Sequence, residues 1–217
     1  MKRESQRKFA VAAGMFTAFV LFTAAGCIVD VQAIGPQGSA VGFASVNRFF
    51  HNLTGVHLSL YLLTDWLSLI PIGVVLGFAL LGLVQWIQRK HLRDVDYSIL
   101  ILGGFYLIVM AVYAFFEKVV VNYRPVLIEG ILEASYPSST TMLVMCVMPT
   151  AMMQFNTRVK STVLRRCIFF AITAFTVCMV VGRLVSGVHW LTDIIGGALL
   201  SAGLVMMYDA ICSLESL

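Results

Sequence analysis

The sequence predicts an all-α protein, a single bundle of six membrane-spanning helices with both termini on the cytoplasmic side. Of its 217 residues, 59% are hydrophobic and only 12% are charged, which is far from the composition of a soluble domain. The apolar residues gather in six long runs, and the basic residues gather in alternate segments between them. The length allows one integral membrane domain over residues 1–217 without a sizeable soluble domain.

The first run, 9–29, follows a short basic segment, a pattern that signal peptides share. We interpret it as a membrane helix because it is long enough to span. A mixed segment at 46–50 fits a helix that lies at the membrane interface. The next run, 66–87, contains Pro71, which a helix inside a bundle tolerates because its neighbours satisfy the freed carbonyl. The remaining spans are expected over 99–116, 138–155, 167–181 and 190–207.

The lysines and arginines divide unequally between the two sides of this topology. A cytoplasmic N-terminus places eleven of the 15 cations inside: Lys2, Arg3, Arg7, Lys8, Arg89, Lys90, Arg93, Arg158, Lys160, Arg165 and Arg166. The four others, Arg48, Lys118, Arg124 and Arg183, fall outside. This split fits the positive-inside rule and predicts a cytoplasmic N-terminus. A bacterial-type plasma (inner) membrane is the simplest compartment for this topology. The net charge of +4 therefore reports topology, and we expect the lipid bilayer rather than a nucleic acid as partner.

The five cysteines lie in apolar runs without the spacing of metal ligands. They are Cys27, Cys146, Cys167, Cys178 and Cys212. Small buried thiols behave as hydrophobic side chains, so we expect no disulfide framework and no metal site.

The most distinctive polar segment is Gly-Arg-Leu-Val-Ser-Gly-Val-His-Trp-Leu-Thr-Asp at 182–193. Arg183 can hold an anion through two parallel hydrogen bonds. His189 and Asp193 are four residues apart, so on a helix they share one face and the carboxylate can orient the ring. The segment thus predicts a nucleophile or base beside an anion site. The alternative is a short polar loop between two buried helices, with Asp193 as a helix-start residue.

Two further polar clusters fall on the same predicted outer face. Lys118 and Arg124 supply cations, and the segment 136–141, Tyr-Pro-Ser-Ser-Thr-Thr, opens a helix with hydroxyls and free backbone N–H groups. A helix N-terminus of this kind binds anions. Each residue has an ordinary alternative, since Lys118 can snorkel to the interface and Ser138 can be a simple N-cap. Their convergence around one point predicts a phosphate site.

These three clusters together resemble the signature of the type-2 phosphatidic acid phosphatase superfamily. Its parts are Lys118 with Arg124-Pro125, then Pro137-Ser138-Ser139, then Arg183 followed by His189 and Asp193 at the family's spacing. The family contains integral membrane lipid phosphatases and phosphotransferases. The resemblance implies a six-helix core over about residues 35–208, a site on the non-cytoplasmic side, and no metal or other cofactor.

Carried onto this sequence, the resemblance implies a role for each site residue. His189 is the nucleophile that forms a phosphohistidine, and Asp193 holds its other ring nitrogen. The cations Lys118, Arg124 and Arg183 neutralise the phosphate oxygens in the transition state. Ser138 and the backbone N–H groups of Ser139 and Thr140 complete the cradle. Water then cleaves the phosphoenzyme.

The sequence departs from the family pattern at three places. Five residues instead of six separate Lys118 from Arg124, and Gly182 stands where a serine is common. Ser139 and Thr140 replace the usual Gly-His, and that histidine is the family's general acid. None of the remaining histidines replaces it by position, since His51 and His57 lie in the first loop and His91 lies on the other side.

Thr140 cannot protonate an alkoxide at neutral pH, and general acid help contributes on the order of 100- to 10,000-fold. A diphosphate suffers less, because its leaving group is a phosphate ester that is stable as an anion. The sequence therefore predicts a hydrolase of lipid phosphates that prefers a prenyl or other lipid diphosphate, such as an undecaprenyl carrier. A phosphotransferase with a lipid or sugar acceptor remains an alternative. So does a non-catalytic protein that binds a lipid phosphate, although such a binder needs neither His189 nor Asp193.

Overall fold

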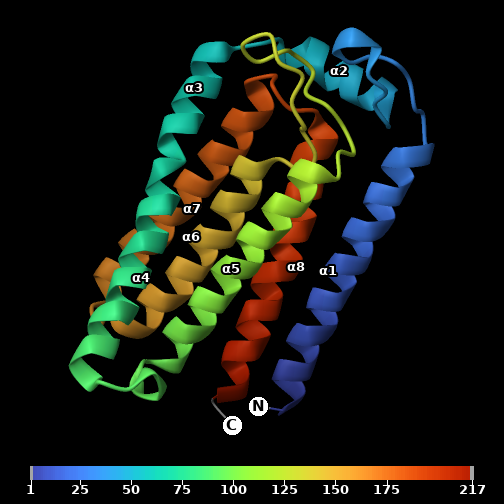
Figure 1. Cartoon of the computed structure of the whole chain (residues 1–217). Coiled ribbons are helices and arrows are strands. Elements are labelled where there is room, and N and C mark those ends of the chain that lie inside the picture. Colours follow the sequence, from blue (N-terminus) through green and yellow to red (C-terminus); the bar gives the residue numbers. More distant parts are fainter. Residues whose placement is uncertain (1, 216–217) are drawn as a thin grey trace.

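The computed structural model describes residues 2–215, and apart from three isolated β-bridges in loops the regular structure of this range is helical. The α-helices are α1 (Lys2–Ile28), α2 (Ala44–Thr54), α3 (Leu58–Leu67), α4 (Leu69–Arg89), α5 (Tyr97–Lys118), α6 (Ser139–Arg158), α7 (Thr162–Val185) and α8 (Leu191–Glu215), with short 3-10 turns η1 (Pro36–Gly38) and η2 (Leu92–Asp94). The predicted all-α class is confirmed. Figure 1 shows the long helices side by side, α2 across one end, and both ends of the chain at the other.

Five helical segments of the described range are long and apolar enough to cross a membrane. They are Arg3–Ile28, Leu58–Arg89, Tyr97–Lys118, Thr162–Val185 and Leu191–Leu214. Five of the six predicted spans overlap these segments. The sixth, 138–155, coincides with α6, a long helix that is not among the five. The bundle thus contains the helix that we expected, but composition alone does not mark it as a span.

Helix α6 is less apolar because other helices surround it. It packs against α4, α5, α7 and α8, so its side chains face protein more than lipid. Several of its buried side chains are polar, and they find partners inside the bundle. Thr150 donates to the carbonyl of Cys146 at 2.8 Å, and Gln154 donates to the hydroxyl of Tyr208 at 2.5 Å. Polar groups in the membrane are tolerated when they are hydrogen-bonded in this way.

The predicted second span begins earlier than expected, at Leu58 rather than near residue 66. A break at Ser68 separates α3 from α4, and Pro71 lies in the first turn of α4. The backbone ladder is weak at this point, since the Ile72 N–H lies 3.5 Å from the Ser68 carbonyl and proline has no N–H to donate. The added turns of α3 extend the span toward the end of the bundle where α2 lies (Figure 1).

Helix α2 confirms a helix around the predicted segment 46–50. Phe49 and Leu53 are exposed on one side, whereas Asn47 is buried on the other. The Asn47 amide donates to Thr192 Oγ1 at 2.9 Å, and its carbonyl oxygen accepts from the Thr192 backbone N–H at 3.2 Å. These bonds fix α2 to the first turn of α8.

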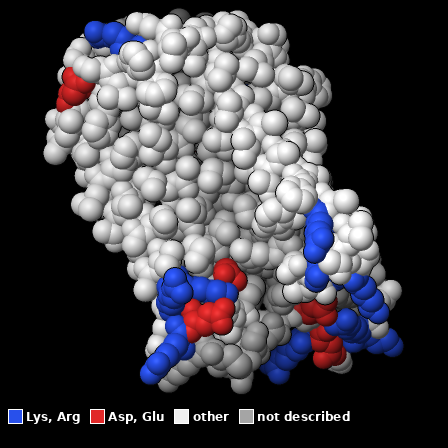
Figure 2. Space-filling model, turned by 180° about the vertical axis from the view of Figure 1, so that it is seen from behind, with Lys and Arg blue, Asp and Glu red and all other residues white. Residues whose placement is uncertain are grey.

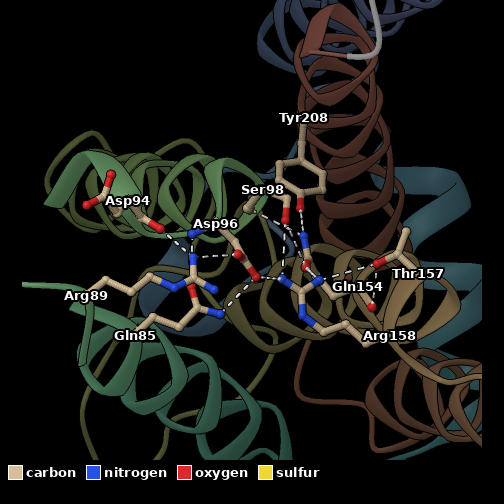
Figure 3. Close-up of polar contacts among 9 residues, drawn as sticks. All are labelled: Gln85, Arg89, Asp94, Asp96, Ser98, Gln154, Thr157, Arg158 and Tyr208. Atoms are coloured by element: carbon tan, nitrogen blue, oxygen red, sulfur yellow. Dashed lines mark hydrogen bonds and ion pairs between the residues drawn. The ribbon is translucent and has the colours of Figure 1, made fainter. Parts of the chain in front are cut away.

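Basic side chains gather at the end of the bundle where the chain termini lie (Figure 2). The predicted topology rests on this distribution of cations. Residues 1, 216 and 217, the ends of the chain, lie outside the described range. Figure 3 shows a polar network at this end, centred on Asp96. Its carboxylate accepts from Gln85 at 2.8 Å, from Arg89 at 3.0 Å and from Arg158 at 3.2 Å. These bonds, that from Gln85 foremost, lower the pKa of Asp96 and tie α4 to α6.

Candidate active site

The predicted site residues come from four places that meet at the end of the bundle opposite the termini (Figure 1). The end of α7 carries Arg183, and the turn before α8 carries His189. The loop between α5 and α6 carries Arg124, and the start of α6 carries Thr140. A fifth contribution, not predicted from the sequence motifs, comes from α3.

His189 lies in the turn between α7 and α8, not on a helix, and it is only 3% exposed. Its Nε2 lies 3.4 Å from a terminal nitrogen of Arg124, and its Nδ1 lies 3.0 Å from Ser135 Oγ. A guanidinium can only donate, so Nε2 accepts and the ring proton sits on Nδ1. The Nε2 lone pair therefore faces the arginine, which is the tautomer that a nucleophile at this atom requires.

Asp193 orients His189 through a third residue. The Nδ1 of the ring lies 3.7 Å from Asp193 Oδ2, an ion-pair distance that is too long for a direct hydrogen bond. The Ser135 hydroxyl bridges the two, because it donates to Asp193 Oδ2 and accepts from the ring. The predicted Asp193–His189 contact thus runs through Ser135. We assumed a shared helix face, but His189 precedes the helix and the carboxylate sits too far back to reach the ring.

Asp193 is itself fully buried and firmly held. Its Oδ2 accepts from the backbone N–H of Trp190 at 2.9 Å, and its Oδ1 accepts from Asn122 at 3.3 Å. Its backbone carbonyl accepts from the N–H of Ser138 at 3.1 Å. Asp193 thus holds the turn that carries His189 next to the first turn of α6, so these two polar segments keep a fixed position relative to each other.

Arg183 is only 2% exposed and donates to four groups. One terminal nitrogen reaches the Tyr61 carbonyl and Thr64 Oγ1, both at 3.2 Å. The other reaches Asp65 Oδ1 at 3.2 Å and Thr140 Oγ1 at 2.6 Å. Three of these partners lie on α3, so the arginine is held by a helix that the motifs do not include.

Arg124 faces the same space as Arg183. Its guanidinium lies 5.7 Å from the centre of the Tyr61 ring, and that of Arg183 lies 4.7 Å from the same centre. Arg124 Nε is 2.9 Å from Glu133 Oε2, although the N–H does not point at that oxygen, so the contact is an ion pair and not a hydrogen bond. Among the described residues, the buried Nε–H groups of both arginines lack a hydrogen-bond partner. An unpaired buried donor is costly, and a bound anion would relieve this cost.

The start of α6 supplies further donors. Ser138 is its N-cap, and its hydroxyl accepts from the Thr141 N–H at 3.5 Å. The N–H groups of Ser139 and Thr140 belong to the first turn, where a helix offers no acceptor of its own. Lys118, in contrast, is exposed at the end of α5 and takes no part in the contacts that join the other site residues.

A cavity of about 350 Å³ opens beside the two arginines. Its polar wall is made by Tyr61, Asp65, Arg124, Ser139, Thr140 and Arg183, and its apolar wall by Ile72, Val109, Met110 and Leu143. His189 lines a smaller recess, and Ser139 lines both spaces. The imidazole and the cations thus line two separate spaces that share Ser139, and the larger of these spaces is polar at one side and apolar at the other.

Ser135 and Asp65 are two site residues that were not predicted from the sequence. Ser135 stood two residues before the recognised Pro137, and no spacing rule singled it out. Asp65 could have been found, because a carboxylate within an apolar span is a functional-site hypothesis by default. We placed the start of that span near residue 66, which left Asp65 in the loop.

Burial lowers the pKa of His189 from 6.5 to about 4, against the opposing effect of Asp193. The unfolded chain takes up this proton between pH 6.5 and 4 while the folded protein does not, so acidification across this window destabilises the fold. We expect the difference in melting temperature between wild type and His189→Asn to shrink as the pH falls from 7 to 4. The exposed His91, replaced in the same way, is the control. A difference that stays constant or grows on acidification would contradict the assignment.

Comparisons with known proteins identify the family and the fold. The model of the PAP2 superfamily matches residues 98–209, more than half of the chain. The fold is similar to the crystal structure of the first transmembrane PAP2 type phosphatidylglycerolphosphate phosphatase from Bacillus subtilis, with a TM-score of 0.54, 18% sequence identity, and coverage of 95% of this chain and 96% of that one. No curated protein matches significantly. The matched segment contains His189, Asp193 and both buried arginines, and the chain belongs to the PAP2 superfamily.

Proposed function

We propose that the protein is a membrane lipid phosphatase that transfers the phosphoryl group of its substrate to His189 and then to water. The observation that carries this proposal is the placement of His189 Nε2, whose unprotonated nitrogen lone pair is directed at Arg124. The low pKa of the ring keeps it neutral at physiological pH, as a nucleophile must be. A protein that only binds phosphate has no use for this arrangement.

The surrounding groups suit the charge that develops during phosphoryl transfer. Arg124 and Arg183 have Nε–H groups that lack a hydrogen-bond partner, and the first N–H groups of α6 point out of its N-terminus. In this proposal they hold the non-bridging oxygens, with Ser138 shaping the turn. Lys118 contributes from a greater distance as a screening charge. Asp193, through Ser135, stabilises the positive charge that the ring acquires.

The apolar wall of the cavity supports a lipid substrate. Met110, which lines the site cavity, also lines a second apolar cavity of about 540 Å³ between α4 and α5. A hydrocarbon chain can lie there while its phosphate reaches the arginines. The Bacillus subtilis protein of similar fold is a phosphatidylglycerolphosphate phosphatase, which is consistent with a lipid phosphate.

We further propose that a lipid diphosphate is the preferred substrate. The Thr140 hydroxyl occupies the place of the family's general acid and accepts a hydrogen bond from Arg183. A phosphate leaving group needs no proton, whereas an alcohol does.

We also propose that the site faces the non-cytoplasmic side, since the cations gather at the opposite end of the bundle (Figure 2).

A hydrolysis panel tests the preference. We expect the purified protein to release phosphate from a prenyl diphosphate at least about 100-fold faster than from phosphatidic acid, the lower bound for general acid help. Thr140→His should raise monoester turnover and change diphosphate turnover less, with Thr141→His as the neighbouring control. Equal rates on both substrates in wild type would rule out the preference but leave the phosphatase assignment intact.

A further inference from the structure

Asp65 lies where the motifs place no residue. It comes from α3, outside the segment 98–209 that the family model matches. Its carboxylate pairs with Arg183 at 3.2 Å, and the same arginine nitrogen donates to Thr140 at 2.6 Å. Asp65 therefore shares one donor with the residue that replaces the family's second histidine. Its side chain is 56% exposed, so water reaches it, whereas Arg183 is almost completely buried.

Close packing of α3 on α7 creates the contact between Asp65 and Arg183. A Cβ atom at Gly182 would lie 2.9 Å from Cγ2 of Thr64, so the glycine lets the two helices approach. In the next turn of the chain, Gly187 has a φ of 70°, and a Cβ there would lie 1.9 Å from the carbonyl oxygen of Gly55. Gly182 stands where a serine is common in the family. This departure and the position of Asp65 are thus linked, because the small residue brings the carboxylate to Arg183.

The second half of the proposed reaction needs a base. Water must lose a proton as it attacks phosphohistidine, and a hydroxyl such as that of Thr140 is too weak a base for this step. Asp193 is fully buried behind the imidazole, and Glu133 is engaged in an ion pair with Arg124 Nε. Asp65 lines the 350 Å³ cavity together with Arg124, Thr140 and Arg183. It is the carboxylate of that cavity wall.

We propose that Asp65 is the general base that activates water for hydrolysis of the phosphohistidine. This inference rests on the proposed function. Water transfers a proton to the Asp65 carboxylate while its oxygen bonds to phosphorus. The bond between phosphorus and Nε2 breaks, and its electron pair returns to the ring. The products are hydrogen phosphate, neutral His189 and a protonated Asp65, which then releases its proton to solvent.

The assignment also fits a diphosphate substrate. Formation of the phosphoenzyme from a diphosphate requires no proton donor, so the first step proceeds with Asp65 in its carboxylate form. The second step uses that same form as the base. Asp65 therefore starts both half-reactions in the same form, the carboxylate.

Rapid quenching with a prenyl diphosphate labelled at its terminal phosphate tests this role in the full-length protein. We expect Asp65→Asn to form base-stable, acid-labile phosphoenzyme at a rate within a few-fold of wild type, and to release phosphate 100- to 10,000-fold more slowly, the range for general base help. Labelled protein should accumulate. The control is Asp94→Asn, the same change at an exposed position at the end of the bundle opposite the site, which should release phosphate like wild type.

A second variant guards against a structural effect of the first. Asp65→Ala leaves space at the cavity wall, and added formate should restore part of its phosphate release without changing phosphoenzyme formation. The inference is overturned if Asp65→Asn releases phosphate at the wild-type rate, if it loses phosphoenzyme formation as severely as turnover, or if formate has no effect. Failure of the proposed function looks different, because wild type itself would then form no phosphoenzyme and release no phosphate.

Discussion

His189→Asn is expected to abolish phosphate release, with a loss on the order of 10⁴- to 10⁶-fold, as for other enzymes that lose their nucleophile. Asparagine can keep a hydrogen bond to Ser135, but its amide nitrogen lone pair is delocalised and does not attack phosphorus. The measurement is release of labelled phosphate from a prenyl diphosphate, together with acid-labile label on the protein. Both should vanish together.

The matched control for this variant is His91→Asn, an exposed histidine at the opposite end of the bundle, which should turn over like wild type. Substrate should still bind to His189→Asn, because Arg124 and Arg183 remain. Label that stays on the protein in His189→Asn would show that another residue is the nucleophile. Residual turnover above about 1% of wild type would argue against a covalent route through this residue.

Arg183→Lys is expected to lower kcat/KM by about 100- to 1,000-fold, the range for loss of one preorganised donor to a transition-state oxyanion. Lysine keeps the charge but not the planar fork, so it cannot reach Tyr61, Thr64, Asp65 and Thr140 together. Most of the loss should appear in kcat, because the guanidinium is prepositioned for charge that develops in the transition state.

Arg166→Lys is the control for Arg183→Lys, since it makes the same change on the same helix at an exposed position. It should leave kcat/KM within about two-fold of wild type. The melting temperature of Arg183→Lys should also fall, because buried acceptors on α3 lose their donor. A change in KM alone would show that Arg183 binds substrate and transition state equally well.

Composition and periodicity were sufficient for the all-α class and for most of the helices. Long apolar runs form helices in a membrane because no other structure satisfies the backbone within one segment. Composition was less informative for α6, whose buried polar side chains lower its hydropathy below that of the other spans. Its place in the middle of the bundle is a property of packing, since four neighbouring helices shield it from lipid.

In the site, too, some features were predictable from the sequence and others depend on packing. Motif spacing was enough to select Arg124, Arg183, His189 and Asp193, and the structure brings these four together. Spacing also selected Lys118, which the structure leaves exposed at the end of α5. An exposed cation and a buried one look alike in a sequence, because burial depends on which helices pack around them.

The sequence by itself determined the apolar helices and the separation of cations between two ends, and it singled out His189 in the segment 182–193 as the candidate nucleophile. Only the tertiary structure decided how His189 is oriented and what faces it. The Ser135 bridge depends on where a loop folds back over the histidine turn, and the Asp65 contact depends on the approach of α3 to Gly182. Both join residues more than 50 positions apart. Local periodicity carries no information at that separation, because such contacts are set by the packing of whole helices.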